Sequence, residues 1–214
     1  SIDAVPYGGA YFYPDADRTR AYAAFATTGV DMPGPALDVV SHEWTHGLLH
    51  YVGNLRGVLP QSAALHGAFV AYRGHPRLRG ALLEAEGPHF SLGASVEEHL
   101  PGACAGMLRS LHALILAMLA FPAPVLVAVR GQCLGGGLEV ALAGSLIFAA
   151  PDAQLGQPET RLGVFAPAAS VLLPYRVNAA AAEDLLLSGR SVGAEEACSM
   201  GLVQSVVDDP AAAA

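Results

Sequence analysis

The chain has 214 residues, of which 53% are hydrophobic and 14% charged, and its formal net charge is −8. This composition excludes a disordered chain, and because all eleven basic residues are arginines without a basic tract, DNA and RNA are poor candidate partners. The length predicts one main domain, and so apolar a composition favours a homo-oligomer that buries part of its surface between subunits.

The spacing of the cysteines and the first residues of the chain indicate where in the cell the protein is expected. Cys104, Cys133 and Cys198 are odd in number, widely spaced and without a CxxC pair, so neither a disulfide framework nor a cysteine zinc site is predicted. The first residues show no charged stretch followed by an apolar one, and prolines interrupt the apolar stretch 113–129. We therefore expect a cytoplasmic protein without a membrane partner.

Two segments of different composition follow one another along the chain. Residues 1–35 are rich in Gly, Pro, Tyr and Asp, which favours turns and short strands, and residues 37–51 are predicted to form a helix. From Gln61 the sequence becomes rich in Ala and Leu, which predicts a second helix. We expect a boundary between an N-terminal segment, 1–57, and a larger domain, 58–210.

The larger domain repeats one plan, in which a strand leads through a tight glycine turn into a helix. The plan occurs twice, as strand 78–84, turn 90–94 and a helix from 96, and as strand 124–129, turn 134–137 and helix 138–144. The other predicted elements are helix 107–119, strand 145–149, helices near 168–187 and 194–200, and strand 202–207. Strands that alternate with helices predict an α/β fold of stacked ββα units.

The triple glycine 135–137 is a candidate oxyanion hole. Backbone N–H groups at a glycine turn that enters a helix can approach a ligand closely, and the helix N-terminus adds partial positive charge. Such donors stabilise the oxyanion that a thioester carbonyl becomes on enolisation, each by about 3 to 4 kcal/mol. Tight packing is the alternative explanation for a single glycine-rich turn.

Two glutamates follow that turn. Glu139 falls in the first helical turn after the triple glycine, and Glu159 ends the QPE motif at 157–159. Two carboxylates beside an oxyanion hole can divide acid and base roles if their surroundings separate their pKa values. A glutamate in the first turn of a helix is also a common partner of the helix dipole, so spacing alone leaves both interpretations open.

Four glycine-containing motifs follow one another in the larger domain, and their order and spacing carry information that no single motif does. They are FSLGA at 90–94, GQCLGGGLE at 131–139, GQPE at 156–159 and GLV at 201–203. Over about residues 62–208 they resemble the enoyl-CoA hydratase/isomerase (crotonase) family. The resemblance implies a crotonase-like spiral of ββα units, truncated at both ends, with an N-terminal segment that does not look like a crotonase.

The resemblance also implies roles for single residues. By position, the backbone N–H groups of Ala94 and Gly136 would form the oxyanion hole, and Glu139 and Glu159 would be the two carboxylates of a hydratase. The substrate of such an enzyme is an acyl-CoA thioester, so CoA belongs to the substrate and no separate cofactor is expected. The family resemblance further implies a trimer or a dimer of trimers.

A second pair of motifs narrows the resemblance. HFSLGASVEEHLP at 89–101 and GVFAPAAS at 163–170 are similar to the cyclohexa-1,5-diene-1-carbonyl-CoA hydratases of anaerobic aromatic degradation. A cyclic dienoyl-CoA is therefore the substrate that the resemblance favours. Val96, Val164 and Phe165 are candidates for the lining of its pocket, with a place in the core as the alternative for each.

A different motif stands in the N-terminal segment. LDVVSHEWTHG at 37–47 resembles the zinc helix of thermolysin-type metallopeptidases. On a helix, His42 and His46 would share a face and could hold one zinc ion, with Glu43 as the base that activates its water. No acidic residue follows at the spacing of the usual third ligand, and His66 is a weak substitute. No metal site is therefore favoured.

Three functions stay open at this point. A CoA-thioester hydratase is favoured by the two glutamates. A crotonase-like scaffold or acyl-CoA binder without turnover is the alternative, because both ends are short by the standard of the family and no lysine is present to bind the CoA phosphates. A zinc metallopeptidase fragment that uses HEWTH at 42–46 is the third possibility.

Overall fold

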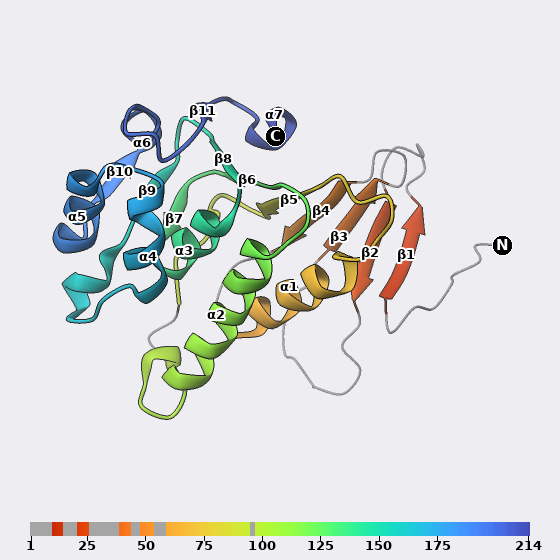
Figure 1. Cartoon of the computed structure of the whole chain (residues 1–214), viewed down its shortest axis with the longest axis horizontal. Helices are drawn as coiled ribbons and strands as arrows, with labels where there is room; N and C mark the ends of the chain where they lie inside the picture. The colour runs from red at the N-terminus through yellow and green to blue at the C-terminus, as the bar shows by residue number, and fades with distance from the viewer. Residues whose placement is uncertain (1–9, 15–20, 26–38, 44–47, 54–58, 95–96) are drawn as a thin grey trace.

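A large mixed sheet runs through the protein (Figure 1). The computed structural model describes residues 10–14, 21–25, 39–43, 48–53, 59–94 and 97–214. Across the sheet, the described strands follow the order β1 (Ala10–Pro14), β2 (Ala21–Phe25), β3 (Val39–Glu43), β4 (Leu48–Gly53), β5 (Gly80–Ala85), β6 (Val125–Val129), β8 (Leu146–Ala149) and β11 (Ser205–Val206).

The sheet changes from antiparallel to parallel at β4. Strands β1 to β4 pair antiparallel with their successive neighbours, whereas the pairs β4–β5, β5–β6, β6–β8 and β8–β11 are parallel. Parallel neighbours need crossover connections, and helices supply them here. These helices are α1 (Leu59–Tyr72), α2 (Cys104–Leu119), α3 (Gly136–Ala143) and α6 (Ala194–Ser199). The predicted α/β alternation is confirmed.

Helices α1 and α2 pack against one another and cross in front of the large sheet in the view of Figure 1. Phe69 of α1 meets Phe121, just beyond α2, edge to face with ring centroids 4.9 Å apart. Leu114 of α2 and Val127 of β6 are buried in the same core. Burial of each such side chain stabilises the fold by roughly 1.5 to 3 kcal/mol, which fixes α2 as one wall of the site described below.

The helix predicted over residues 37–51 is wrong. The described parts of this segment are β3 and β4, which pair antiparallel with His42 opposite Leu49. Val39 and Val40 are β-branched and suit a strand, and pairing with neighbours on both sides favours the sheet over a helix. His42 and Glu43 therefore lack the helical spacing on which the zinc interpretation rests, and His46 lies outside the described residues.

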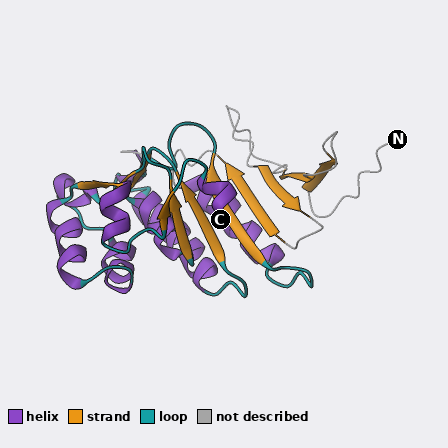
Figure 2. Ribbon diagram, turned by 90° about the horizontal axis from the view of Figure 1, so that it is seen from above, coloured by secondary structure: helices purple, strands orange, loops and turns teal. Residues whose placement is uncertain are grey.

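A second, smaller sheet lies beside the first (Figure 2). Its strands are β10 (Ser191–Gly193), β9 (Gln154–Gly156) and β7 (Gln132–Leu134), with β9 in the middle and β7 parallel to it. The remaining helical elements are η1 (Glu97–His99), η2 (Pro158–Leu162), α4 (Pro167–Leu172), η3 (Leu173–Tyr175), α5 (Ala179–Ser188) and α7 (Pro210–Ala213). The sequence did not predict this sheet, because its strands are only three residues long.

The N-terminal segment shares the large sheet with the rest of the chain. Strand β4 pairs with β5 in a continuous register from Leu48 opposite Gly80 to Gly53 opposite Ala85. The division into 1–57 and 58–210 therefore falls between β4 and α1 in the chain but crosses a paired region of the sheet. It stays a prediction.

Candidate active site

The two glycine turns lie side by side. Ser91 in the first turn, 90–94, forms a β-bridge with Cys133 of β7, and the Ser91 N–H donates to the Gln132 carbonyl oxygen at 2.9 Å. Strand β7 leads directly into the second turn, 135–137. Turns that are more than 40 residues apart in the sequence therefore share one wall of the site, about one hydrogen-bonded strand spacing apart.

Gly135 is required by the close approach of a carboxylate. It precedes α3 and has a φ of +55°, which residues other than glycine rarely adopt. A Cβ atom on Gly135 would lie 2.6 Å from Oε1 of Glu159, which is too close for nonbonded atoms. Gly137 is required for packing, because its Cβ would overlap the Ser91 side chain. Both observations support the packing explanation of this turn, whereas the oxyanion-hole explanation concerns the N–H group of Gly136 between them.

The two predicted oxyanion donors line the same cavity. Ala94 follows Gly93, which has a φ of +87°, and Gly136 is the first residue of α3. The N–H groups of a first helical turn have no partner within their helix. In the described part of the chain, neither the Ala94 N–H nor the Gly136 N–H has a protein acceptor.

Glu139 lies one turn into α3 and is only 2% exposed. Its Oε1 accepts hydrogen bonds from the N–H groups of Ala168 and Ala169 in the first turn of α4, at 2.8 and 2.9 Å. Glu139 therefore joins the N-terminus of its own helix to the N-terminus of another. Two donors on one oxygen hold the carboxylate in place and leave Oε2 without a protein donor in the described part of the chain.

Glu159 approaches from the second sheet. It follows β9, in η2, and β9 is the strand parallel to β7, so both strands end at the same edge. The Gly135 N–H donates to the Gly156 carbonyl oxygen at 3.0 Å, which ties the two strand ends together. The amide of the buried Gln157 lies against Glu159: its Nε2 donates to the Gly135 carbonyl oxygen at 3.3 Å, and with the amide turned over it would instead donate to the two Glu159 oxygens at 2.9 and 3.2 Å.

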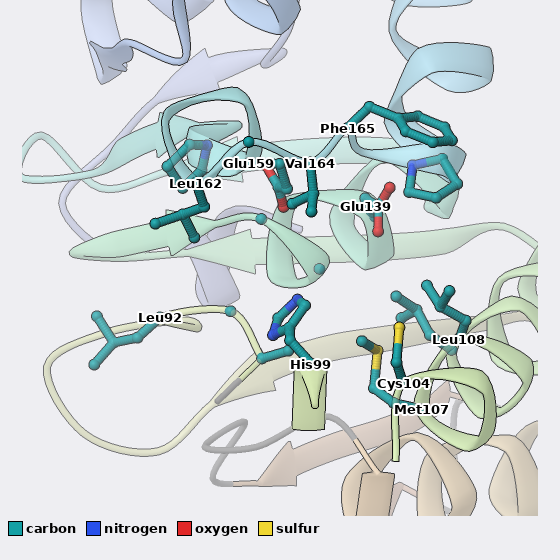
Figure 3. A pocket seen from close by; sticks show the side chains of 18 residues that line it. Leu92, His99, Cys104, Met107, Leu108, Glu139, Glu159, Leu162, Val164 and Phe165 are labelled. Atoms are coloured by element: carbon teal, nitrogen blue, oxygen red, sulfur yellow. The ribbon is translucent and has the colours of Figure 1, made fainter. Parts of the chain in front are cut away.

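These elements enclose a cavity of about 440 Å³ (Figure 3). Ala94, Gly136, Glu139 and Glu159 all line it, so the structure brings together the four residues that the sequence proposed for chemistry. The two carboxylates come from one wall, and residues of η1 and α2 form the wall that faces them.

Both carboxylates have a raised pKa. Burial raises the pKa of Glu139, while the hydrogen bonds from Ala169 and Ala168 and the charge of His112 partly lower it. Burial also raises the pKa of Glu159; its own backbone N–H and His99 lower it, and the charge of Glu139 raises it further. Two carboxyl groups that share a cavity do not ionise independently, because each charge disfavours the other.

The predicted pocket residues fall into two groups. Val164 and Phe165 line the cavity, and Phe165 is 68% exposed, so it forms part of the rim rather than of the core. Val96 lies outside the described residues. On the opposite wall, sequence reasoning missed His99 and Cys104, because their distance from the glutamates depends on where the fold places η1 and α2.

Within the ranges that the structure describes, no group of three or more His, Cys, Asp or Glu side chains could hold a metal ion. None of the helices in those ranges is both long enough and apolar enough to cross a membrane.

This chain is similar in sequence to known enzymes that act on CoA thioesters. Residues 61–212 match the sequence model of a family described as enoyl-CoA hydratase/isomerase. The chain is 62% identical over 152 residues to a cyclohexa-1,5-dienecarbonyl-CoA hydratase of Thauera aromatica. That match covers 71% of this chain and 59% of the relative, so the chain spans somewhat more than half of the relative's length.

Solved structures show the same fold. An enoyl-CoA hydratase/carnithine racemase of Magnetospirillum magneticum superposes with a TM-score of 0.74 at 25% identity, over 82% of this chain and 70% of that one. An enoyl-CoA hydratase of Mycobacterium smegmatis has a TM-score of 0.71 at 26% identity, over 77% of this chain and 67% of that one. The predicted fold class is confirmed.

Proposed function

Because this chain belongs to the enoyl-CoA hydratase/isomerase family, we propose that it is a hydratase that adds water to a C=C bond conjugated with a CoA thioester. One observation carries the proposal: Glu139, Glu159, Ala94 and Gly136 all line a single cavity. A scaffold without turnover has no need for a buried and a half-buried carboxylate in one cavity, each with a pKa that loss of contact with water raises. Such groups are costly to stability and are typical of functional sites.

The thioester carbonyl oxygen would accept hydrogen bonds from the N–H groups of Ala94 and Gly136. As water attacks the β-carbon, the electrons of the C=C bond move toward this oxygen, which becomes negative. The partial positive charge at the N-terminus of α3 favours that change. Loss of one such donor commonly reduces turnover by roughly 10² to 10³ fold.

The carboxylates would divide the proton transfers. Glu139 accepts two backbone hydrogen bonds that favour its ionised form, so it suits the base that takes a proton from the attacking water. Glu159 feels the charge of Glu139, which favours its protonated form, so it suits the acid that gives a proton to the α-carbon. The elements of one water molecule are added, and the proton on Glu139 returns to Glu159 through solvent before the next turnover.

The preferred substrate is a cyclic dienoyl-CoA. The relative from Thauera aromatica is named for such a substrate, and its identity of 62% extends over the whole matched region. The cavity walls beyond the carboxylates are mainly apolar, with Leu108, Met107 and Phe165 among them, as a hydrocarbon ring requires. CoA is part of this substrate, and the proposed reaction uses no further cofactor.

Two proposals concern the chain beyond the site. We propose that residues 58–210 form the acyl-CoA domain and residues 1–57 an appended segment, on the basis of the family match at 61–212. We also propose a homo-oligomer, because exposed apolar side chains such as Leu116, Leu119 and Val171 gather on α2 and α4.

Turnover of a panel of enoyl- and dienoyl-CoA thioesters tests the function. Hydration should be fastest with a cyclic dienoyl-CoA, and Glu139→Gln and Glu159→Gln should each lower kcat by roughly 10² to 10⁴ fold. Glu183→Gln on the exposed face of α5 is the control and should change nothing. Absence of hydration by the unmodified chain, or unchanged rates in both site variants, would overturn the proposal.

A further inference from the structure

The wall that faces the glutamates carries a histidine. Among the described residues that line the cavity, His99 is the only basic one. It ends the short helix η1, five residues after the donor residue Ala94, and its ring points into the cavity toward the side that holds Glu159 (Figure 3). The other residues on this wall, such as Met107 and Leu111, are apolar.

The proposed reaction moves negative charge from Glu139 to Glu159. Before water is added, Glu139 carries the charge and Glu159 carries the proton. Afterwards Glu139 is protonated and Glu159 is ionised, so one unit of negative charge has moved toward Glu159. A cation near Glu159 favours that change and stabilises the transition state more than the ground state.

We propose that His99 is a positioning residue of this site, which acts through Glu159 by stabilising the carboxylate that Glu159 becomes when its proton passes to carbon. This inference rests on the proposed hydratase function. His99 is exposed, so solvent screens its charge and the effect is modest rather than decisive. Sequence reasoning did not identify it, because only the fold brings η1 opposite η2.

Other charged groups near Glu159 do not provide this effect. Glu139, on α3, opposes ionisation of Glu159. Arg161 is on the same element as Glu159, but its Nε donates to the Ser188 carbonyl oxygen at 3.4 Å and its side chain does not line the cavity. His112 acts on Glu139 instead. His99 is therefore the cation that distinguishes Glu159 from Glu139.

Titration of the Glu159 carboxyl carbon by NMR in the ligand-free protein tests the effect of His99 on Glu159 without any need for turnover. His99→Gln should raise the Glu159 pKa by roughly 0.2 to 0.7 on the pH scale, the size expected for a partly exposed pair. His99→Lys, which carries a positive charge, should return the Glu159 pKa toward that of the unmodified protein. His66→Gln on α1 is the matched control, because His66 does not line the cavity, and it should leave Glu159 unchanged.

Kinetics then test the consequence. His99→Gln should lower kcat by roughly two- to fivefold with little change in KM, and His99→Lys should recover most of the loss. An unchanged Glu159 titration in His99→Gln, or a lysine variant that behaves like the glutamine variant, would overturn the inference. If the unmodified chain hydrates no thioester, the proposed function fails, but the NMR titration still decides whether His99 acts on Glu159.

Discussion

Glu139 is a buried carboxylate whose charge the fold compensates only in part. Two backbone N–H groups bond to one of its oxygens, yet the net effect of its surroundings is a raised pKa, with burial as the largest cause. A group whose pKa is higher in the folded protein than in the unfolded chain stabilises the fold below the unfolded pKa, and this contribution is lost as the pH rises through the folded pKa.

Glu139→Gln should therefore increase stability while it lowers turnover. The amide oxygen can still accept from Ala168 and Ala169, and no charge is buried. We expect the free energy of unfolding in urea to rise by roughly 0.5 to 2 kcal/mol at pH 8, with the difference shrinking toward zero near pH 4. Glu139→Ala leaves both N–H groups without an acceptor and should lose stability at both pH values. A less stable glutamine variant at pH 8 would contradict this account.

Gly135→Ala tests the close approach of turn and carboxylate. The new Cβ would displace Glu159, and the backbone conformation is unfavourable for alanine, so kcat should fall at least 100-fold and stability by roughly 1 to 3 kcal/mol. Gly67→Ala is the matched control, because Gly67 is helical, its Cβ would meet open space, and alanine should add roughly 0.5 to 1 kcal/mol. Both are measured by urea unfolding and initial rates.

At the scale of elements, α3 is held at both ends. Glu139 near its N-terminus bonds to α4, and at its C-terminus the guanidinium of Arg176 donates to the carbonyl oxygens of Leu142, Gly144 and Ser145. A cation is favoured at a helix C-terminus, where carbonyl groups have no partner within the helix. Arg176 thus holds the helix that presents Glu139 and Gly136.

Arg176→Met should show how much the hydrogen bonds from Arg176 to the end of α3 contribute to stability. It keeps an apolar stem but removes every donor, so we expect a loss of roughly 1 to 3 kcal/mol in the free energy of unfolding and a smaller loss of kcat. Arg161→Met is the comparison, because Arg161 is exposed and makes one long hydrogen bond, and it should change stability by less than about 0.5 kcal/mol. Equal losses in the two variants would contradict a specific role for Arg176.

The elements also show what the sequence could predict. Periodicity and glycine turns predicted α1, α2, β6 and α3 close to their observed bounds, because α1 and α2 bury apolar residues at helical spacing and β6 and α3 are apolar and buried almost throughout. The motif HEWTH was misleading, because helical spacing in the sequence does not prevent strand pairing with neighbours. Neighbours that only the fold brings together, such as Gln157 beside Glu159 or His99 on the facing wall, cannot be predicted from a local sequence pattern.

At the scale of the whole molecule, the described N-terminal strands join the rest of the large sheet through the pairing of β4 with β5. Strand β4 covers the edge of β5, and β5 is a central strand whose Leu82 and Leu83 are buried. An uncovered strand of this kind presents unpaired N–H and carbonyl groups to other chains. Pairing with β4 therefore shields β5 from other chains.

Removal of residues 1–57 should test that protection. Without β1 to β4, β5 becomes an edge, so the shortened chain should associate beyond the state of the full chain, increasingly with concentration, and unfold at a lower temperature. Light scattering after size exclusion and thermal unfolding measure the two effects. A chain that lacks only residues 1–9 keeps every described strand and serves as the control. The opposite outcome is a shortened chain with the same association state and unfolding temperature as the full chain. In that case residues 58–210 would be an independent domain, and the pairing of β4 with β5 would contribute little to stability.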